Sequence, residues 1–194
     1  PTFRVNVQAL VDVQPKDLDA SEIDVRLGAT WIDAKYIQQF MYETFDTSPY
    51  LKHTIKVNYT SVTSEWQITC KTSVSQRDVA AYTTYGTSRA NAYKILEDSL
   101  NLRDVRIYDT VEDADGKERR VLNGKETALA AQKQRAIRTA FQDWIWKDPE
   151  RRQTLVRQYN EEMNAIRPRE YDGSHIAFVG MNPEITLREH QRNA

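Results

Sequence analysis

Two stretches of the sequence combine residue types that can bind a nucleic-acid backbone. The first lies on the polar side of an expected long helix and just beyond its end: Arg135, Arg138, Trp146, Arg151 and Arg152. A tryptophan among arginines is typical of a nucleic-acid groove, because the indole stacks on a base while guanidinium groups contact phosphates. In the alternative interpretation, Trp146 packs beneath the helix that follows, and the arginines are solvated.

The second stretch contains Thr87 and Arg89, within the run Tyr85-Gly-Thr-Ser-Arg89. We expect a helix to begin at Gly86 and Thr87. Free backbone N–H groups at a helix start, together with hydroxyls and an arginine, can hold a backbone phosphate. The alternative is a capped helix whose arginine is merely solvated.

Catalytic patterns are absent from the sequence. It has neither a Walker A loop nor a G-x-G-x-x-G turn, and its three histidines stand far apart. Glu161 and Glu162 are adjacent on an expected helix and point about 100° apart, which makes them poor partners for acid–base chemistry. Cys70 is expected to be a small core residue rather than a nucleophile. We therefore predict no catalytic residue, no metal site and no cofactor in this segment.

The formal net charge of −1 hides an asymmetry along the chain. Residues 1–50 carry 4 basic and 8 acidic side chains, or 4 − 8 = −4, whereas residues 133–169 carry 9 and 5, or 9 − 5 = +4. The basic half favours a surface for polyanions, although solvated helix faces give the same count. No apolar run approaches the roughly 20 residues that span a bilayer, so we expect a cytoplasmic protein without membrane contact.

Periodicity predicts an α+β fold, a single compact domain of amphipathic helices with two β-hairpins. Helices are expected over 21–27 (ended by Gly28), from Asp33, over 86–100, from Asn123 to about 147, from Pro149 to about 167, and from Thr186. The hairpins are expected over 55–60 with 65–71, and over 105–111 with 119–122. Asp33, Asn123, Asp148 and Thr186 are the expected N-caps.

The same periodicity predicts which side chains are buried. In the helix after Asp33, the amphipathic stripe consists of Tyr36, Ile37, Phe40, Met41 and Thr44. The expected core residues of the other helices are Tyr93, Leu96, Leu100, Leu129, Ala136, Ile137, Ala140, Phe141, Trp144, Ile145, Leu155, Val156, Tyr159, Met163 and Ile166. Trp31 and Trp66 lie in apolar patterns and are expected in the core as well. Residues 168–183 are expected to be irregular.

The C-terminal stretch resembles a known family. Arg167-Pro-Arg-Glu-Tyr-Asp-Gly-Ser-His175 and Gly180-Met-Asn-Pro-Glu-Ile-Thr-Leu-Arg-Glu-His-Gln-Arg-Asn-Ala194 resemble the segment ahead of the ATPase motor in large bacterial SNF2-type (superfamily 2) helicases. These proteins are carried on phages, plasmids and integrative elements and are often fused to an adenine-specific DNA methylase. The resemblance extends through residues 143–152, 85–93 and 24–31.

The resemblance implies an accessory domain over residues 1–180 and the start of an ATPase lobe over 181–194. Leu187-Arg-Glu-His-Gln191 is similar to the Q-motif of such motors, in which Gln191 would read the adenine of ATP. ATP and magnesium are implied for the parent motor and not for this segment. The chain starts at Pro1 and stops early in its expected last helix, so we expect it to be part of a longer protein.

Two functions follow as expectations. In the first, the segment is non-catalytic and contacts or positions DNA for the ATP-driven motor. In the second, it is a structural domain that docks the motor to a methylase or another partner and has no affinity for nucleic acid.

Overall fold

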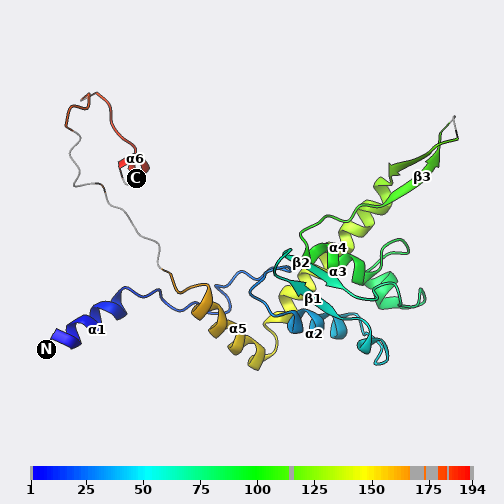
Figure 1. The fold of residues 1–194 in the computed structure, drawn as a ribbon, viewed down its shortest axis with the longest axis horizontal. Coiled ribbons are helices and arrows are strands. Elements are labelled where there is room, and N and C mark those ends of the chain that lie inside the picture. The colour runs from blue at the N-terminus through cyan, green and yellow to red at the C-terminus, as the bar shows by residue number, and fades with distance from the viewer. Residues whose placement is uncertain (1, 114–115, 167–172, 174–178, 183, 193–194) are drawn as a thin grey trace. The chain divides into compact units, whose positions relative to one another are not determined.

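The computed structural model describes residues 2–113, 116–166, 173, 179–182 and 184–192. It is an α+β structure in which two antiparallel hairpins are embedded among helices, as the sequence predicts (Figure 1). The chain divides into two compact units, residues 18–159 and residues 1–17 with 160–194. This division concerns packing only, and the expected domain boundary after residue 180 stays a prediction.

The smaller unit contains helices α1 (Thr2–Asp12) and α6 (Glu189–Arg192). Helix α1 ends before Pro15, and its apolar side chains, such as Phe3 and Leu10, are exposed. Helix α6 begins three residues after Thr186, so the predicted N-cap is wrong. The expected irregular segment 168–183, with Arg169 and His175, lies largely outside the described residues.

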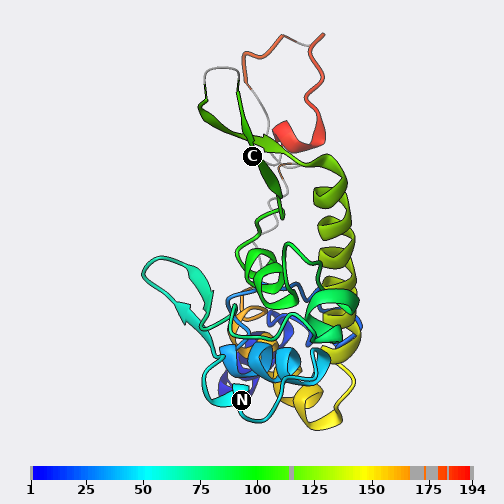
Figure 2. The same ribbon diagram turned by 90° about the vertical axis from the view of Figure 1, so that its right-hand side faces the viewer.

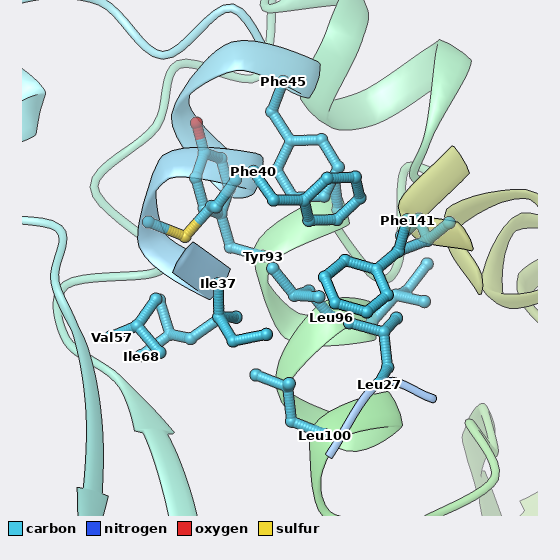
Figure 3. Packing of buried hydrophobic residues seen from close by; sticks show 14 of the residues in the cluster. Leu27, Ile37, Phe40, Phe45, Val57, Ile68, Tyr93, Leu96, Leu100 and Phe141 are labelled. Carbon is cyan, nitrogen blue, oxygen red and sulfur yellow. The ribbon is translucent and has the colours of Figure 1, made fainter. Parts of the chain in front are cut away.

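The core of the larger unit forms where α2 (Ala34–Thr44), α3 (Ala92–Leu100) and α4 (Gly124–Ile145) meet (Figure 3). The ring of Phe40 lies 5.2 Å from that of Phe141, with the two planes 80° apart. Phe45 and Tyr93 make a similar edge-to-face contact at 5.3 Å. Such pairs contribute roughly 0.5–1.5 kcal/mol beyond the area they bury, so aromatic contacts join three helices that are distant in sequence.

Local signals place the starts of these helices. The side chain of Asp33 accepts the N–H of Lys35, and that of Asn123 accepts the N–H of Glu126 at 2.9 Å. The Asn123 capping box is half formed, because its own N–H bonds to the carbonyl of Ile107. Asp148 caps α5 (Pro149–Glu162) through the N–H of Arg151. These three predicted caps are confirmed.

The first hairpin pairs β1 (Val57–Thr60) with β2 (Glu65–Ile68) in the register Val57↔Ile68. Val57 and Ile68 are buried against the helices, as Figure 3 shows. Side chains of α3 and of its C-cap also bond to the backbone of β2: Glu97 accepts the N–H of Ile68, and Asn101 accepts that of Trp66. The predicted hairpin and the burial of Trp66 are both confirmed.

The second hairpin pairs β3 (Tyr108–Glu112) with β4 (Glu118–Leu122) and lies at the N-terminal end of α4 (Figure 2). Gly116 supplies the positive φ, +76°, that the turn needs. Most side chains of both strands are exposed, and the guanidinium of Arg120 stacks over the ring of Tyr108. The predicted hairpin is confirmed, and it contributes little to the core.

Several predicted helix bounds are wrong. Residues 21–27 form turns rather than a helix, and Gly28 (φ +90°) approaches the carbonyl of Leu100 instead of ending a helix. Residues 80–84 form a π-helical turn, η2 (Ala80–Thr84). Helix α3 begins at Ala92 rather than at Gly86. Helix α5 ends at Glu162, five residues before the expected end.

Some predicted core residues lie at the surface. Leu129, Ala136, Met163 and Ile166 are exposed, as is Cys70, whereas Trp31 is half-buried. The buried face of α4 consists of Ala130, Gln134, Ile137, Phe141 and Ile145. The carboxamide of Gln134 donates to the carbonyl of Arg103 at 2.7 Å. A polar side chain with a backbone partner thus takes a core place that the apolar pattern did not assign to it.

We predict that Gly86→Ala strongly destabilises the larger unit. An added Cβ would lie 2.0 Å from the carbonyl oxygen of Ala81 and 2.7 Å from the N of Ala92. Both are backbone atoms, so the chain itself must shift, at an expected loss of about 3 kcal/mol or more in the free energy of unfolding. Chemical denaturation measures this loss.

Gly124→Ala is the matched control, because an added Cβ there meets nothing within 4 Å. It lies in the first turn of α4, so alanine should leave stability unchanged or raise it by less than about 1 kcal/mol. Equal denaturation midpoints for the two variants would contradict the prediction.

A candidate binding site along helix α4

One exposed ridge of α4 carries both of the helix arginines predicted to bind nucleic acid. Arg135, Arg138 and Gln142 are exposed and lie on one stripe of the helix, with Arg138 at the edge of the face that buries Phe141 and Ile145. Arg135 and Arg138 form no ion pair within the described part of the chain. The structure therefore places these two guanidinium groups where an anion from outside can reach them.

Two hollows lie beside this ridge and share Gln142 in their linings. The first hollow, of about 350 Å³, is lined by Arg26, Leu27, Ser99, Leu102, Arg138 and Gln142. The second hollow, of about 390 Å³, is lined by residues 20–25, Gln142 and Trp146. The segment that was expected to be a helix over 21–27 instead forms turns that line both hollows. Its irregular backbone leaves this space beside α4.

The two hollows differ in charge. The first contains Arg138 and Arg26, of which Arg26 is bonded through Nε to Asp24 at 2.8 Å. The second is lined by Glu22, which forms no ion pair among the described residues, and by Asp24, whose carboxylate is the one bonded to Arg26. Carboxylates repel phosphates, so an anionic ligand is favoured in the first hollow. The half-buried Trp146 packs against the core and lines the second hollow with residues 20–25, which favours the packing interpretation of this residue over the stacking one.

The side chain of Arg151 bonds to backbone groups of its own chain. Its side chain is buried, its Nε donates to the carbonyl of Ile145 at 3.0 Å, and its Nη2 donates to that of Trp144 at 2.6 Å. The guanidinium also lies 3.5 Å from the ring centroid of Trp144. Burial lowers the pKa of this guanidinium from its usual value. Arg151 thus caps the end of α4, whereas the neighbouring Arg152 is exposed.

Thr87 and Arg89 also have partners within the chain. The buried hydroxyl of Thr87 accepts the N–H of Ala90 at 3.0 Å. Arg89 bonds to the carboxylate of Asp109 and, through Nη2, to the carbonyl of Tyr108, both at 2.8 Å. Since α3 begins only at Ala92, neither residue stands at a helix start. The geometry on which the predicted phosphate site depended is absent.

The Arg89–Asp109 pair connects the loop before α3 to the base of the second hairpin. Asn123, the N-cap of α4, donates to the same carboxylate at 2.7 Å. The hydrogen bonds from Arg89 and Asn123 lower the pKa of Asp109, and the bond from Arg89 has the larger effect. Three elements are held together at one carboxylate, so Arg89 has a structural role in orienting the hairpin.

Gln191 lies in the four-residue helix α6, where its side-chain oxygen accepts the N–H of Arg188 at 3.1 Å. The described residues around it supply no phosphate-binding loop. Its expected contact with the adenine of ATP stays a prediction.

Of the six residues that line the first hollow, only Arg138 was a predicted site residue, and Arg26 and Leu102 are the most informative of the others. Arg26 was hidden within an expected helix. Leu102 was not singled out, although no glycine ends α3 and a residue there must adopt an unusual conformation. Its φ is +56°, and its side chain is 78% exposed.

The fold and the hollows define an α+β domain with a candidate ligand site and no recognisable catalytic cluster among its described residues. The chain belongs to the family described as a domain of unknown function (DUF8437), whose model matches residues 26–165. No curated protein and no solved structure matches it significantly.

Metal-ligand clusters and membrane-spanning helices are both absent from the described residues. No group of three or more histidine, cysteine, aspartate or glutamate side chains is placed to hold a metal ion there. Within the same part of the chain, every helix is too short or too polar to cross a membrane.

We predict that Arg151→Ala lowers the free energy of unfolding by about 3 kcal/mol. The change removes two charge-assisted hydrogen bonds and leaves the carbonyls of Trp144 and Ile145 without these donors. Arg151→Lys should recover only part of the loss, because an ammonium group lacks the planar fork.

Arg152→Ala is the control, because the side chain of Arg152 is exposed although it directly follows Arg151 in the sequence. It should change stability by less than about 0.5 kcal/mol. Urea denaturation of the three variants measures these differences, and similar midpoints for Arg151→Ala and Arg152→Ala would show that the cap is unimportant.

Proposed function

We propose that this chain is a non-catalytic accessory domain that contacts DNA through the exposed ridge of α4 and positions it for an SNF2-type motor in a longer protein. The observation that carries the proposal is the exposure of Arg135 and Arg138 on one ridge, unpaired among the described residues, beside the first hollow. ATP, magnesium and any methyl transfer belong to the motor or methylase of that longer protein. We propose that the protein acts in the bacterial cytoplasm and that its gene is carried on a mobile genetic element.

The chemistry of the ridge favours phosphate contact over base reading. Guanidinium groups pair bidentately with phosphate oxygens, and arginine keeps its charge throughout the physiological range. Arg152 is exposed in the first turns of α5 and can add a third contact. Phosphate contacts of this kind do not depend on the DNA sequence, and the affinity they give falls steeply as the salt concentration rises.

Arg89, Thr87 and Arg151 are not included in the proposed contact set. Each already bonds to groups of the chain, so a phosphate would have to displace an internal partner. Trp146 is excluded too, because Glu22 and Asp24 line its hollow.

The proposal predicts weak, salt-dependent binding to labelled duplex and single-stranded DNA in fluorescence anisotropy. With two or three phosphate contacts, affinity should fall roughly 10- to 40-fold between about 50 mM and about 200 mM salt. The double variant Arg135→Ala with Arg138→Ala should weaken binding at low salt. It should also reduce the slope of log affinity against log salt by the amount that corresponds to about two phosphate contacts. Binding that is absent at about 50 mM salt would refute the proposal.

Arg77→Ala provides the control for the loss of one charge, and the ridge variant with which it is compared is Arg138→Ala alone. Arg77 is an exposed arginine of the loop before η2 and lines neither hollow. Removal of this single charge should change affinity less than about twofold. An equal loss in the control and in the ridge variant would show that only total charge matters.

A second candidate function is docking to the motor or another partner. The observation in its favour is the exposure of several apolar side chains in the smaller unit: Phe3, Leu10, Ile166, Val179 and Ile185. Where such side chains form a contiguous patch, they mark an interaction site. This candidate predicts no DNA affinity at low salt, so the same titration separates it from the leading proposal.

A further inference from the structure

Leu102 occupies a backbone position that disfavours its side chain. It follows Asn101, the C-cap of α3, with a φ of +56°. The N–H of Leu102 bonds to the carbonyl of Ser99, and that of Arg103 bonds to Asp98. This is the Schellman arrangement, in which the left-handed residue is usually glycine. A leucine there is strained, because its Cβ crowds the neighbouring carbonyl.

The side chain gains little from the fold in return. It is 78% exposed, so burial of its apolar surface does not offset the backbone strain. It lines the first hollow together with the buried Leu27. Strained positions at a hollow are where function outweighs stability. The ligand of the hollow is therefore expected to contact Leu102.

The rest of the lining indicates the chemistry of that ligand. Two leucines supply apolar surface, Arg26 and Arg138 supply cationic groups, and the Gln142 amide offers a donor and an acceptor in one plane. A volume of about 350 Å³ is near the lower end for small-molecule sites. The hollow suits one planar group with an attached anion rather than a length of peptide.

We propose that the first hollow binds one unpaired nucleotide of single-stranded DNA, with its base against Leu27 and Leu102 and its phosphate on Arg138. Gln142 is placed to bond to the base edge, and Arg26 can approach the same phosphate once it exchanges its contact with Asp24. This inference rests on the proposed function and adds a preference to it. A paired base is stacked within its duplex and cannot enter, so only an unpaired or extruded base fits.

Leu102→Gly is the decisive variant, since it relieves the backbone while removing the contact. The melting temperature should rise, because glycine adopts this φ without strain. At about 50 mM salt, affinity for a thymidine oligonucleotide of about 12 nucleotides should fall roughly fivefold, because the apolar contact with the leucine side chain is lost. Affinity for a duplex of similar length should change less than about twofold, since phosphate contacts dominate there.

Ser64→Gly is the matched control for the backbone. Ser64 also has a positive φ, 54°, in the exposed turn between β1 and β2, and it lines neither hollow. Its replacement should raise the melting temperature and leave binding to both DNA forms unchanged.

The outcomes distinguish the inference from the function beneath it. If both DNA forms bind and weaken with Arg138→Ala, but Leu102→Gly leaves single-strand affinity unchanged, the nucleotide site is wrong and the DNA-contact function stands. If neither form binds at low salt, the function itself is refuted and the site with it. Tighter binding of an alternating aspartate–leucine peptide than of the oligonucleotide would also overturn the site.

Discussion

The packing of Phe141 in α4 against Phe40 in α2 sets the orientation on which the rest of the larger unit depends. The contact, with Ile137 and Ile145 on the same face, fixes which side of α4 is buried. A helix with one face in a close-packed core cannot rotate without opening a cavity. Arg135 and Arg138 are therefore held at the surface by the apolar side chains behind them.

The ends of α4 are set by polar groups rather than by the core. At its start, Asn123 caps the helix and shares the carboxylate of Asp109 with Arg89, which connects the helix to the second hairpin. At its end, Arg151, which lies in the first turn of α5, donates hydrogen bonds to the last carbonyls of α4. A buried guanidinium is stable there because hydrogen bonds and the face of Trp144 replace its water. Two of the arginines expected to bind DNA thus build the scaffold that presents the others.

What the sequence predicts well is local. The Asp33, Asn123 and Asp148 caps and both hairpins depend on residues a few positions apart, and all were predicted. The Gly86 contact with Ala81 and the bonds from Arg89 to the hairpin depend on packing between elements. An arginine that solvates a surface and one that caps another helix look alike in one sequence, so Arg151 and Arg152 could not be distinguished. The hollows were unpredictable because they depend on irregular turns over residues 21–27, where a helix was expected.

The first hollow is a proposed binding site that contains no catalytic residue. Its polar groups are ordinary surface side chains, and each alone would pass as solvated. Leu102 differs, since both its conformation and its exposure lower stability in the same place. An apolar side chain held in the left-handed region at the edge of a cationic hollow is consistent with selection for contact rather than for folding. The proposed nucleotide site would give the α4 ridge a preference that charge alone cannot supply. Guanidinium groups attract the phosphates of every DNA form, whereas an apolar wall distinguishes an exposed base from a stacked one.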